Sequence, residues 1–112
     1  MLRYSDLTQT QKDAICNGCG AKSGWIPVPN FLFKASCNHH DFYYWRGGDE
    51  SDREEADDAF YKYMRVDIED QNHVIKFRAY YHFWALSYYL AVRYFGKQHF
   101  EYRDEMKTIK DI

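Results

Sequence analysis

Cys37-Asn38-His39-His40-Asp41-Phe42-Tyr43-Tyr44 is the stretch of sequence that decides the fold. On a helix, residues spaced i, i+3, i+4 and i+7 share one face. That spacing brings four chemically active side chains onto one face of the segment: Cys37, His40, Asp41 and Tyr44. Their grouping predicts that this helix is the centre of a functional site.

Helix signals surround this stretch on both sides. We expect helices over about 5–15, 30–45, 51–68 and 73–95. The predicted N-caps are Ser5 or Thr8, Asn30, Ser51 with Glu54 in a capping box, and Asn72, and the predicted stops are Gly47-Gly48 and Gly96. Residues 97–112 are polar and predict a short helix or a loose tail. Strand signals are nearly absent, so the fold class is all-α, in a single domain over 1–112 with a loop-rich N-terminal third.

The composition is that of a small globular protein. Apolar residues make up 46% of the chain and aromatic residues 20%, which is enough to build a core. The net charge is −2, so no basic field exists to hold a nucleic-acid backbone, and nucleic acid is not an expected partner. The first residues contain no apolar signal region, so we expect a cytoplasmic product unless another route exports it.

A second stripe follows on the helix expected over 51–68. It consists of Arg53, Ala56, Asp57, Phe60 and Met64. Two antiparallel helices joined at Gly47-Gly48 would face each other along these stripes. His40 is then expected to meet Asp57, which is the arrangement of a base and the carboxylate that orients it.

Asp41 follows His40 directly, so on a helix it points about 100° away and cannot orient the same imidazole. Its carboxylate can bind a hard cation instead. The loop expected over 17–24 contains three glycines, which let backbone carbonyls turn inward. Oxygen ligands of this kind are typical of Ca²⁺ sites.

The motif Cys-x-x-His-Asp-x-x-Tyr resembles the active-site helix of the secreted phospholipase A2 superfamily. The bacterial and fungal branch is the most similar, with a Gly-Cys loop before this helix and Asp-x-x-Phe after it. Gly18-Cys19 and Asp57-Asp58-Ala59-Phe60 match those two elements. The resemblance covers about 16–64, and residues beyond about 67 lie outside it.

The resemblance implies a small helical domain with two antiparallel active-site helices and a Gly-rich metal loop. It implies calcium-dependent hydrolysis of the sn-2 ester of a glycerophospholipid, with phospholipid or a membrane surface as partner. The roles that it implies are a base that activates water (His40), a carboxylate behind it (Asp57), a tyrosine on that carboxylate (Tyr44), a calcium ligand on the helix (Asp41), loop ligands (Asn17, Gly18 and Gly20), and a disulfide (Cys19 and Cys37).

The chain departs from the family pattern in three respects. Asn17 stands where bacterial relatives often place an acidic ligand, and its uncharged amide should weaken calcium binding. The segment between Cys19 and Cys37 is longer than in the venom enzymes. The family is secreted, and a cytoplasmic product would keep its cysteines reduced.

A zinc site is the competing interpretation. Cys16-x2-Cys19 and Cys37-x2-His40 have the spacing of zinc ligands. The protein would then be a non-catalytic binding or structural module, zinc-stapled or phospholipase-like. Similarity at the family level suggests a phage or prophage assembly as its setting. This interpretation explains Cys16 but leaves Asp41, Tyr44 and Asp57 without a role. A further alternative is a buried histidine with no chemistry at His40.

Aromatic residues suggest two further surfaces. The helix expected over 73–95 is apolar around most of its circumference, which favours a core helix, or a face buried against another copy of the chain, over a lipid-facing collar. Three aromatic residues flank the site and are the expected lipid contacts: Trp25, Phe31 and Trp45.

Overall fold

The computed structural model describes residues 1–16, 32–70 and 75–112. In chain order the helices are α1 (Gln9–Ile15), α2 (Lys34–Arg46), α3 (Glu50–Asp70) and α4 (Ile75–Phe95), with short 3-10 turns at Tyr4–Asp6, Gly96–Gln98 and Ile109–Asp111. No strand occurs within these ranges, so the all-α prediction is confirmed there. No helix of the described ranges is long and apolar enough to cross a membrane.

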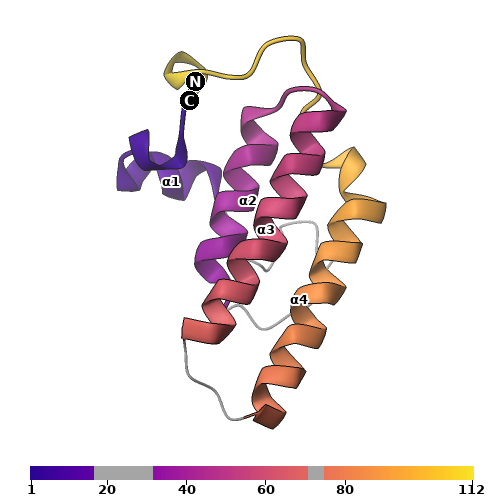
Figure 1. Ribbon diagram of the computed structural model, residues 1–112. Helices are drawn as coiled ribbons and strands as arrows, with labels where there is room; N and C mark the ends of the chain where they lie inside the picture. The colour runs from indigo at the N-terminus through magenta and orange to yellow at the C-terminus, as the bar shows by residue number, and fades with distance from the viewer. Residues whose placement is uncertain (17–31, 71–74) are drawn as a thin grey trace.

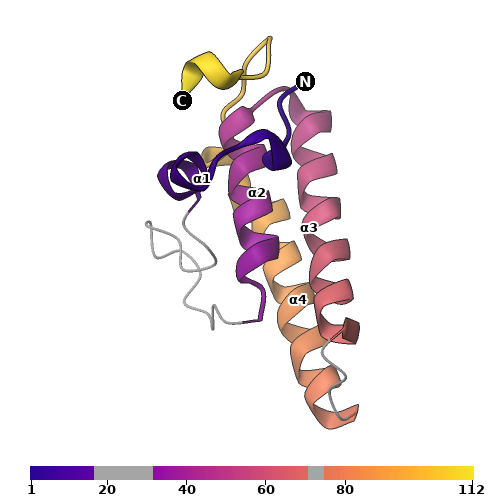
Figure 2. The ribbon, with the colours of Figure 1, turned by 90° about the vertical axis from the view of Figure 1, so that its left-hand side faces the viewer.

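Helices α2, α3 and α4 lie side by side and run up, down and up (Figure 1). Helix α3 is in the middle of this layer and packs against both neighbours. The short helix α1 lies across the side of α2 (Figure 2). The antiparallel pair of α2 and α3 that the sequence predicted is therefore present, and it carries both faces of the expected site.

Capping residues set where α1 and α3 begin. Thr8, one of the two predicted caps, is the N-cap of α1, and it forms a reciprocal capping box with Gln11 that was not predicted. Helix α3 begins earlier than predicted, at Glu50. The Asp49 carboxylate accepts a hydrogen bond from the Asp52 amide at 3.0 Å, and the Asp52 carboxylate accepts one from the Asp49 amide at 2.9 Å. The predicted box of Ser51 and Glu54 is therefore wrong, because Asp49 is an equally good cap two residues earlier.

Gly47 ends α2, as predicted, in a conformation that favours glycine. Its φ is 77° and its ψ is −165°, a region that residues with a Cβ rarely adopt. A Cβ at this position would also collide with the carbonyl oxygen of Glu101. The tight turn between α2 and α3, which brings the two site-bearing faces together, therefore depends on a glycine here.

We expect Gly47→Ala to lower the free energy of unfolding by about 1–3 kcal/mol, because the backbone must be strained and the C-terminal segment displaced. Urea unfolding followed by circular dichroism measures this loss. Glu54→Ala, at an exposed position on α3, serves as the control. Equal stability of the two variants would contradict the role given to Gly47.

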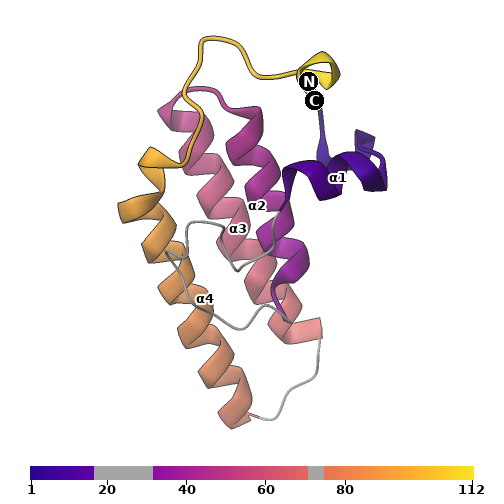
Figure 3. The same ribbon diagram turned by 180° about the vertical axis from the view of Figure 1, so that it is seen from behind.

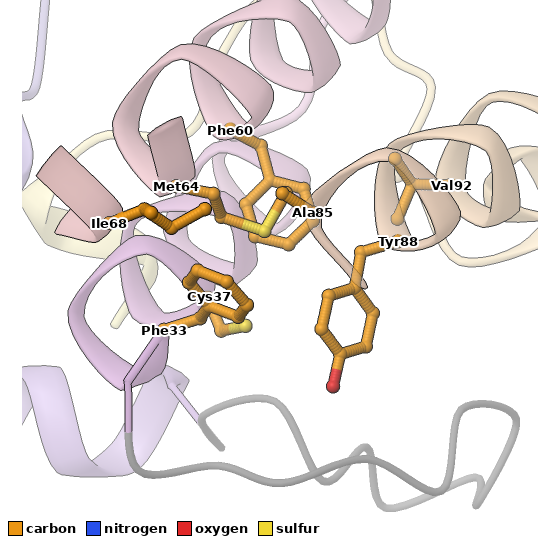
Figure 4. Packing of buried hydrophobic residues seen from close by; sticks show 8 residues of the cluster. All are labelled: Phe33, Cys37, Phe60, Met64, Ile68, Ala85, Tyr88 and Val92. Carbon is orange, nitrogen blue, oxygen red and sulfur yellow. The ribbon is translucent and has the colours of Figure 1, made fainter. Parts of the chain in front are cut away.

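The core lies between the three long helices (Figure 4). Eight buried residues form it: Phe33, Cys37, Phe60, Met64, Ile68, Ala85, Tyr88 and Val92. The apolar stripe predicted on α3 is confirmed, since Phe60 and Met64 both point into this cluster. Burial of aromatic and aliphatic side chains on this scale is the main stabilising term for a domain of this size.

Helix α4 contributes one face to the core and leaves the other exposed. Ala85, Tyr88 and Val92 are buried. Phe83 and Tyr94 on the outer face keep 63% and 76% of their surface. The expectation of a core helix therefore holds for one face only. Figure 3 shows α4 from behind, on the side of α3 away from α2 and α1.

The C-terminal segment returns to the turn between α2 and α3. The Glu101 amide donates to the Tyr44 carbonyl at 3.2 Å, and the Lys107 amide donates to the Arg46 carbonyl at 2.8 Å. Gly48 forms a bridge with Tyr102. These hydrogen bonds fix the segment over the end of α2 rather than leaving it as a loose tail.

Candidate active site

His40 and Asp57 meet between α2 and α3. The Nε2 atom of His40 lies 2.7 Å from Oδ1 of Asp57. Both side chains are buried, and Asp57 has no exposed surface at all. The ring of Phe60 stacks on the imidazole with centroids 4.5 Å apart, and this packing restricts how the ring can turn. The contact expected from the two helical stripes is therefore present.

Tyr44, one turn after His40, binds the same carboxylate oxygen. Its hydroxyl donates to Oδ1 of Asp57 at 2.7 Å. Burial, together with the negative charge of Asp57, raises the pKa of Tyr44 far above its ordinary value. The tyrosine therefore stays protonated and remains a hydrogen-bond donor. The ring of Phe100 packs edge-on against Tyr44 and closes this end of the site.

Two arginines complete the surroundings of Asp57, and the sequence analysis gave neither a role. Arg93 on α4 donates to Oδ2 of Asp57 at 2.8 Å, and Arg53 on α3 lies 3.4 Å from the same atom. Arg53 stood on the predicted stripe, and an arginine in an otherwise apolar face is a signal of a buried anionic partner. Arg93 carried no such signal, because its contact depends on how α4 packs.

This geometry decides which imidazole nitrogen is free to act. An ionised carboxylate only accepts hydrogen bonds, so His40 must donate its Nε2–H to Asp57. In the neutral imidazole, Nδ1 is then the acceptor. His40 is thereby held in the tautomer that a general base requires, with the carboxylate placed to stabilise the imidazolium.

Asp41 follows His40 directly on α2, so its side chain points about 100° away around the helix axis, and it is partly exposed. Its negative charge acts on Cys16, and the pKa of the Cys16 thiol rises to about 12 through burial first and the charge of Asp41 second. Asp41 is therefore close to the point where the chain enters the expected metal loop. The other expected ligands, Asn17, Gly18 and Gly20, lie outside the described residues.

Asp41 is the one expected calcium ligand among the described residues, and its carboxylate is the type of oxygen ligand that Ca²⁺ takes. Within 1–16, 32–70 and 75–112, no three His, Cys, Asp or Glu side chains are grouped as a metal site. A site built from side chains of the described residues alone is therefore not present.

The two described cysteines, Cys16 and Cys37, differ in their covalent state. Cys37 is disulfide-bonded, whereas Cys16 is a free thiol that donates to the Asn38 carbonyl at 3.2 Å. Cys19, the expected partner in a disulfide, lies outside the described residues. Two of the four ligands that the zinc interpretation requires, Cys37 and His40, are therefore engaged in other contacts.

Of the three expected lipid contacts, only Trp45 lies in the described residues. Trp45 packs against Phe42 with ring centroids 6.1 Å apart, and the ammonium group of Lys107 lies 4.9 Å above its ring. The C-terminal segment thus covers part of this side chain. Trp25 and Phe31 lie outside the described residues.

Comparison with known proteins finds no relative. No family model, no curated protein and no solved structure matches the chain. The functional argument therefore depends on the residues and their geometry.

Proposed function

We propose that this protein is a calcium-dependent hydrolase of the phospholipase A2 type, which cleaves the sn-2 ester of glycerophospholipids. One observation carries the proposal: His40, Asp57 and Tyr44 form a buried hydrogen-bonded set, in which His40 and Tyr44 each lie 2.7 Å from the same oxygen of Asp57. The set has the form of a base, its orienting carboxylate and a second donor, and its members stand in the order that the resemblance assigns.

In this mechanism His40 takes a proton from a water molecule at Nδ1. The imidazolium that forms is stabilised by Asp57 through the Nε2–H hydrogen bond. Tyr44 keeps the carboxylate in place, since its raised pKa leaves it a donor at all physiological pH values. The water oxygen attacks the ester carbonyl as its proton passes to His40. The bond between the acyl carbon and the sn-2 oxygen then breaks, and the imidazolium returns its proton to that oxygen, so no covalent enzyme intermediate forms.

Calcium is the cofactor that this reaction needs. Asp41 would hold it together with Asn17 and the carbonyls of Gly18 and Gly20. Calcium held there would act as a Lewis acid for the ester carbonyl and the developing oxyanion. Asp41 and His40 are adjacent on α2, so one helix would carry both the metal ligand and the base.

The disulfide at Cys37 favours a particular compartment. Structural disulfides persist in oxidising surroundings and are rare in the cytosol. We therefore propose that the protein acts after export, in place of the cytoplasmic location expected at first. Export would also bring a lipid-cleaving enzyme to a membrane surface.

The direct test is release of fatty acid from phospholipid vesicles by the full chain. The proposal expects release with calcium, none above background after EDTA, and recovery when calcium is returned. Metal analysis of the same sample separates the alternative. Stoichiometric zinc that is released by thiol reagents, without fatty-acid release, would overturn the proposal in favour of the zinc-stapled module.

We expect Asp41→Asn to reduce fatty-acid release to background at calcium concentrations that saturate the parent, because a neutral amide binds Ca²⁺ more weakly than a carboxylate does. High calcium should restore part of the activity. Asp58→Asn, on the exposed side of α3, is the matched control and should leave release unchanged. Parent-like activity in Asp41→Asn would exclude this residue as the calcium ligand.

A further inference from the structure

The two oxygens of Asp57 have separate sets of partners. His40 and Tyr44 both bind Oδ1, each at 2.7 Å. The arginines lie on Oδ2, with Arg93 at 2.8 Å and Arg53 at 3.4 Å. Oδ1 therefore makes the hydrogen bond with the histidine, and Oδ2 binds the arginines that connect the carboxylate to the rest of the fold.

Arg53 is held mainly by partners other than Asp57. Its guanidinium donates to both oxygens of Glu50 and to the Val92 carbonyl at 2.9 Å. These contacts fix Arg53 between α3 and α4 whether or not Asp57 is present. Arg53 is therefore chiefly a brace between the two helices, and its longer contact with Asp57 is secondary.

Arg93 makes the shorter contact with Asp57 and comes from a different helix. Its side chain is 22% exposed, and its other ionic partner, Glu50, lies farther away at 3.6 Å. Charge-assisted hydrogen bonds to a carboxylate are strong and directional. The position of Oδ2, and through it the direction of Oδ1 toward His40, thus depends on α4.

We propose that Arg93 is a positioning residue for the His40–Asp57 pair. It fixes the rotamer of Asp57, and Asp57 in turn fixes the tautomer and orientation of the imidazole. The inference rests on the proposed function. It extends the site to α4, a helix outside the region of resemblance, to which no role in the reaction was assigned.

The test compares Arg93→Met and Arg93→Lys with the parent in two measurements. Steady-state kinetics on a soluble short-chain phospholipid separates kcat from KM. Long-range ¹H–¹⁵N NMR on the calcium-free protein at about pH 8, where imidazoles are ordinarily neutral, reports the tautomer of His40. Arg78→Met is the matched control, because Arg78 also lies on α4 and also pairs with a carboxylate, that of Glu69, but far from the site.

We expect Arg93→Met to lower kcat by about tenfold to a hundredfold with little change in KM, the size typical of groups that orient a functional histidine through its partner. The NMR signal of the Nε2–H tautomer should lose intensity in the same variant. Arg93→Lys should recover part of both, since the ammonium can still reach Oδ2. Arg78→Met should behave as the parent.

Parent-like kcat and an unchanged tautomer in Arg93→Met would overturn the inference, as would an equal loss in Arg78→Met. If Arg93→Met does not fold, the same comparison between Arg93→Lys and Arg78→Lys decides the question. A parent that releases no fatty acid would overturn the proposed function alone. The tautomer measurement would then still show whether Arg93 orients the pair.

Discussion

His40→Gln is expected to lower fatty-acid release by about a thousandfold at saturating calcium, because general-base assistance of this kind contributes typically 10²–10⁴ in rate. Glutamine is close to histidine in size and can still donate a hydrogen bond to Asp57. It has no nitrogen that accepts a proton from water. The variant should therefore fold normally and bind calcium as the parent does, with the loss confined to kcat.

The control for this experiment stands next to it in the chain. His39 is half-buried, packs on the Tyr4 ring with centroids 3.9 Å apart and makes no contact with Asp57. His39→Gln removes an imidazole from the same helix turn and should leave release within about twofold of the parent. Comparable residual activity in His40→Gln and the parent would contradict the mechanism. An equal loss in both variants would instead indicate that each substitution acts by disturbing the structure of α2.

Most of the helix positions could be predicted from the sequence, because local capping signals define them. Thr8 caps α1 at one of the two predicted positions, and Gly47 marks the end of α2. The spacing of His40 against the stripe on α3 predicted a contact because a short turn constrains the two helices to pack antiparallel. Where two local signals competed, as Asp49 and Ser51 did for the start of α3, only the packed structure decided between them.

The surroundings of Asp57 could be predicted only in part, for a physical reason. His40, Tyr44 and Asp57 belong to consecutive helices, whereas Arg93 reaches the site from α4, 36 residues after Asp57. Nothing local in the sequence says which turn of α4 lies opposite α3. The exposed outer face of α4 could not be predicted for the same reason. The helix is apolar around most of its circumference, so its sequence does not show which side packs against the other helices.

Asp57→Asn is expected to lower the free energy of unfolding by about 3–5 kcal/mol, the cost typical of removing one partner from a buried ion pair. The substitution keeps the shape of the side chain, removes its charge and replaces one acceptor oxygen with an NH₂ donor. The side chain of Asp57 is fully buried and that of Arg53 is 5% exposed, so the guanidinium charges near Oδ2 are left in a poorly solvated place. Urea unfolding with a constant m-value measures the loss.

Asp58→Asn is the control, because it removes the same charge at an exposed position. Asp58 is exposed and accepts a hydrogen bond from the Tyr89 hydroxyl at 3.0 Å, which an asparagine can also accept. Asp58→Asn should therefore change stability by less than about 0.5 kcal/mol, as surface substitutions usually do. A loss below about 1 kcal/mol in Asp57→Asn would show that its ion pairs contribute little.

A double variant identifies where the cost of Asp57→Asn arises. If the loss comes from unpaired guanidinium charge, adding Arg93→Met should cost less in the Asp57→Asn background than in the parent, with a coupling of about 0.5–3 kcal/mol. Additive losses would mean that Arg93 and Asp57 stabilise the fold independently, despite the 2.8 Å contact between them. Coupling in stability together with the tautomer change would tie α4 to the histidine through this carboxylate, because Asp57 binds His40 with one oxygen and Arg93 with the other.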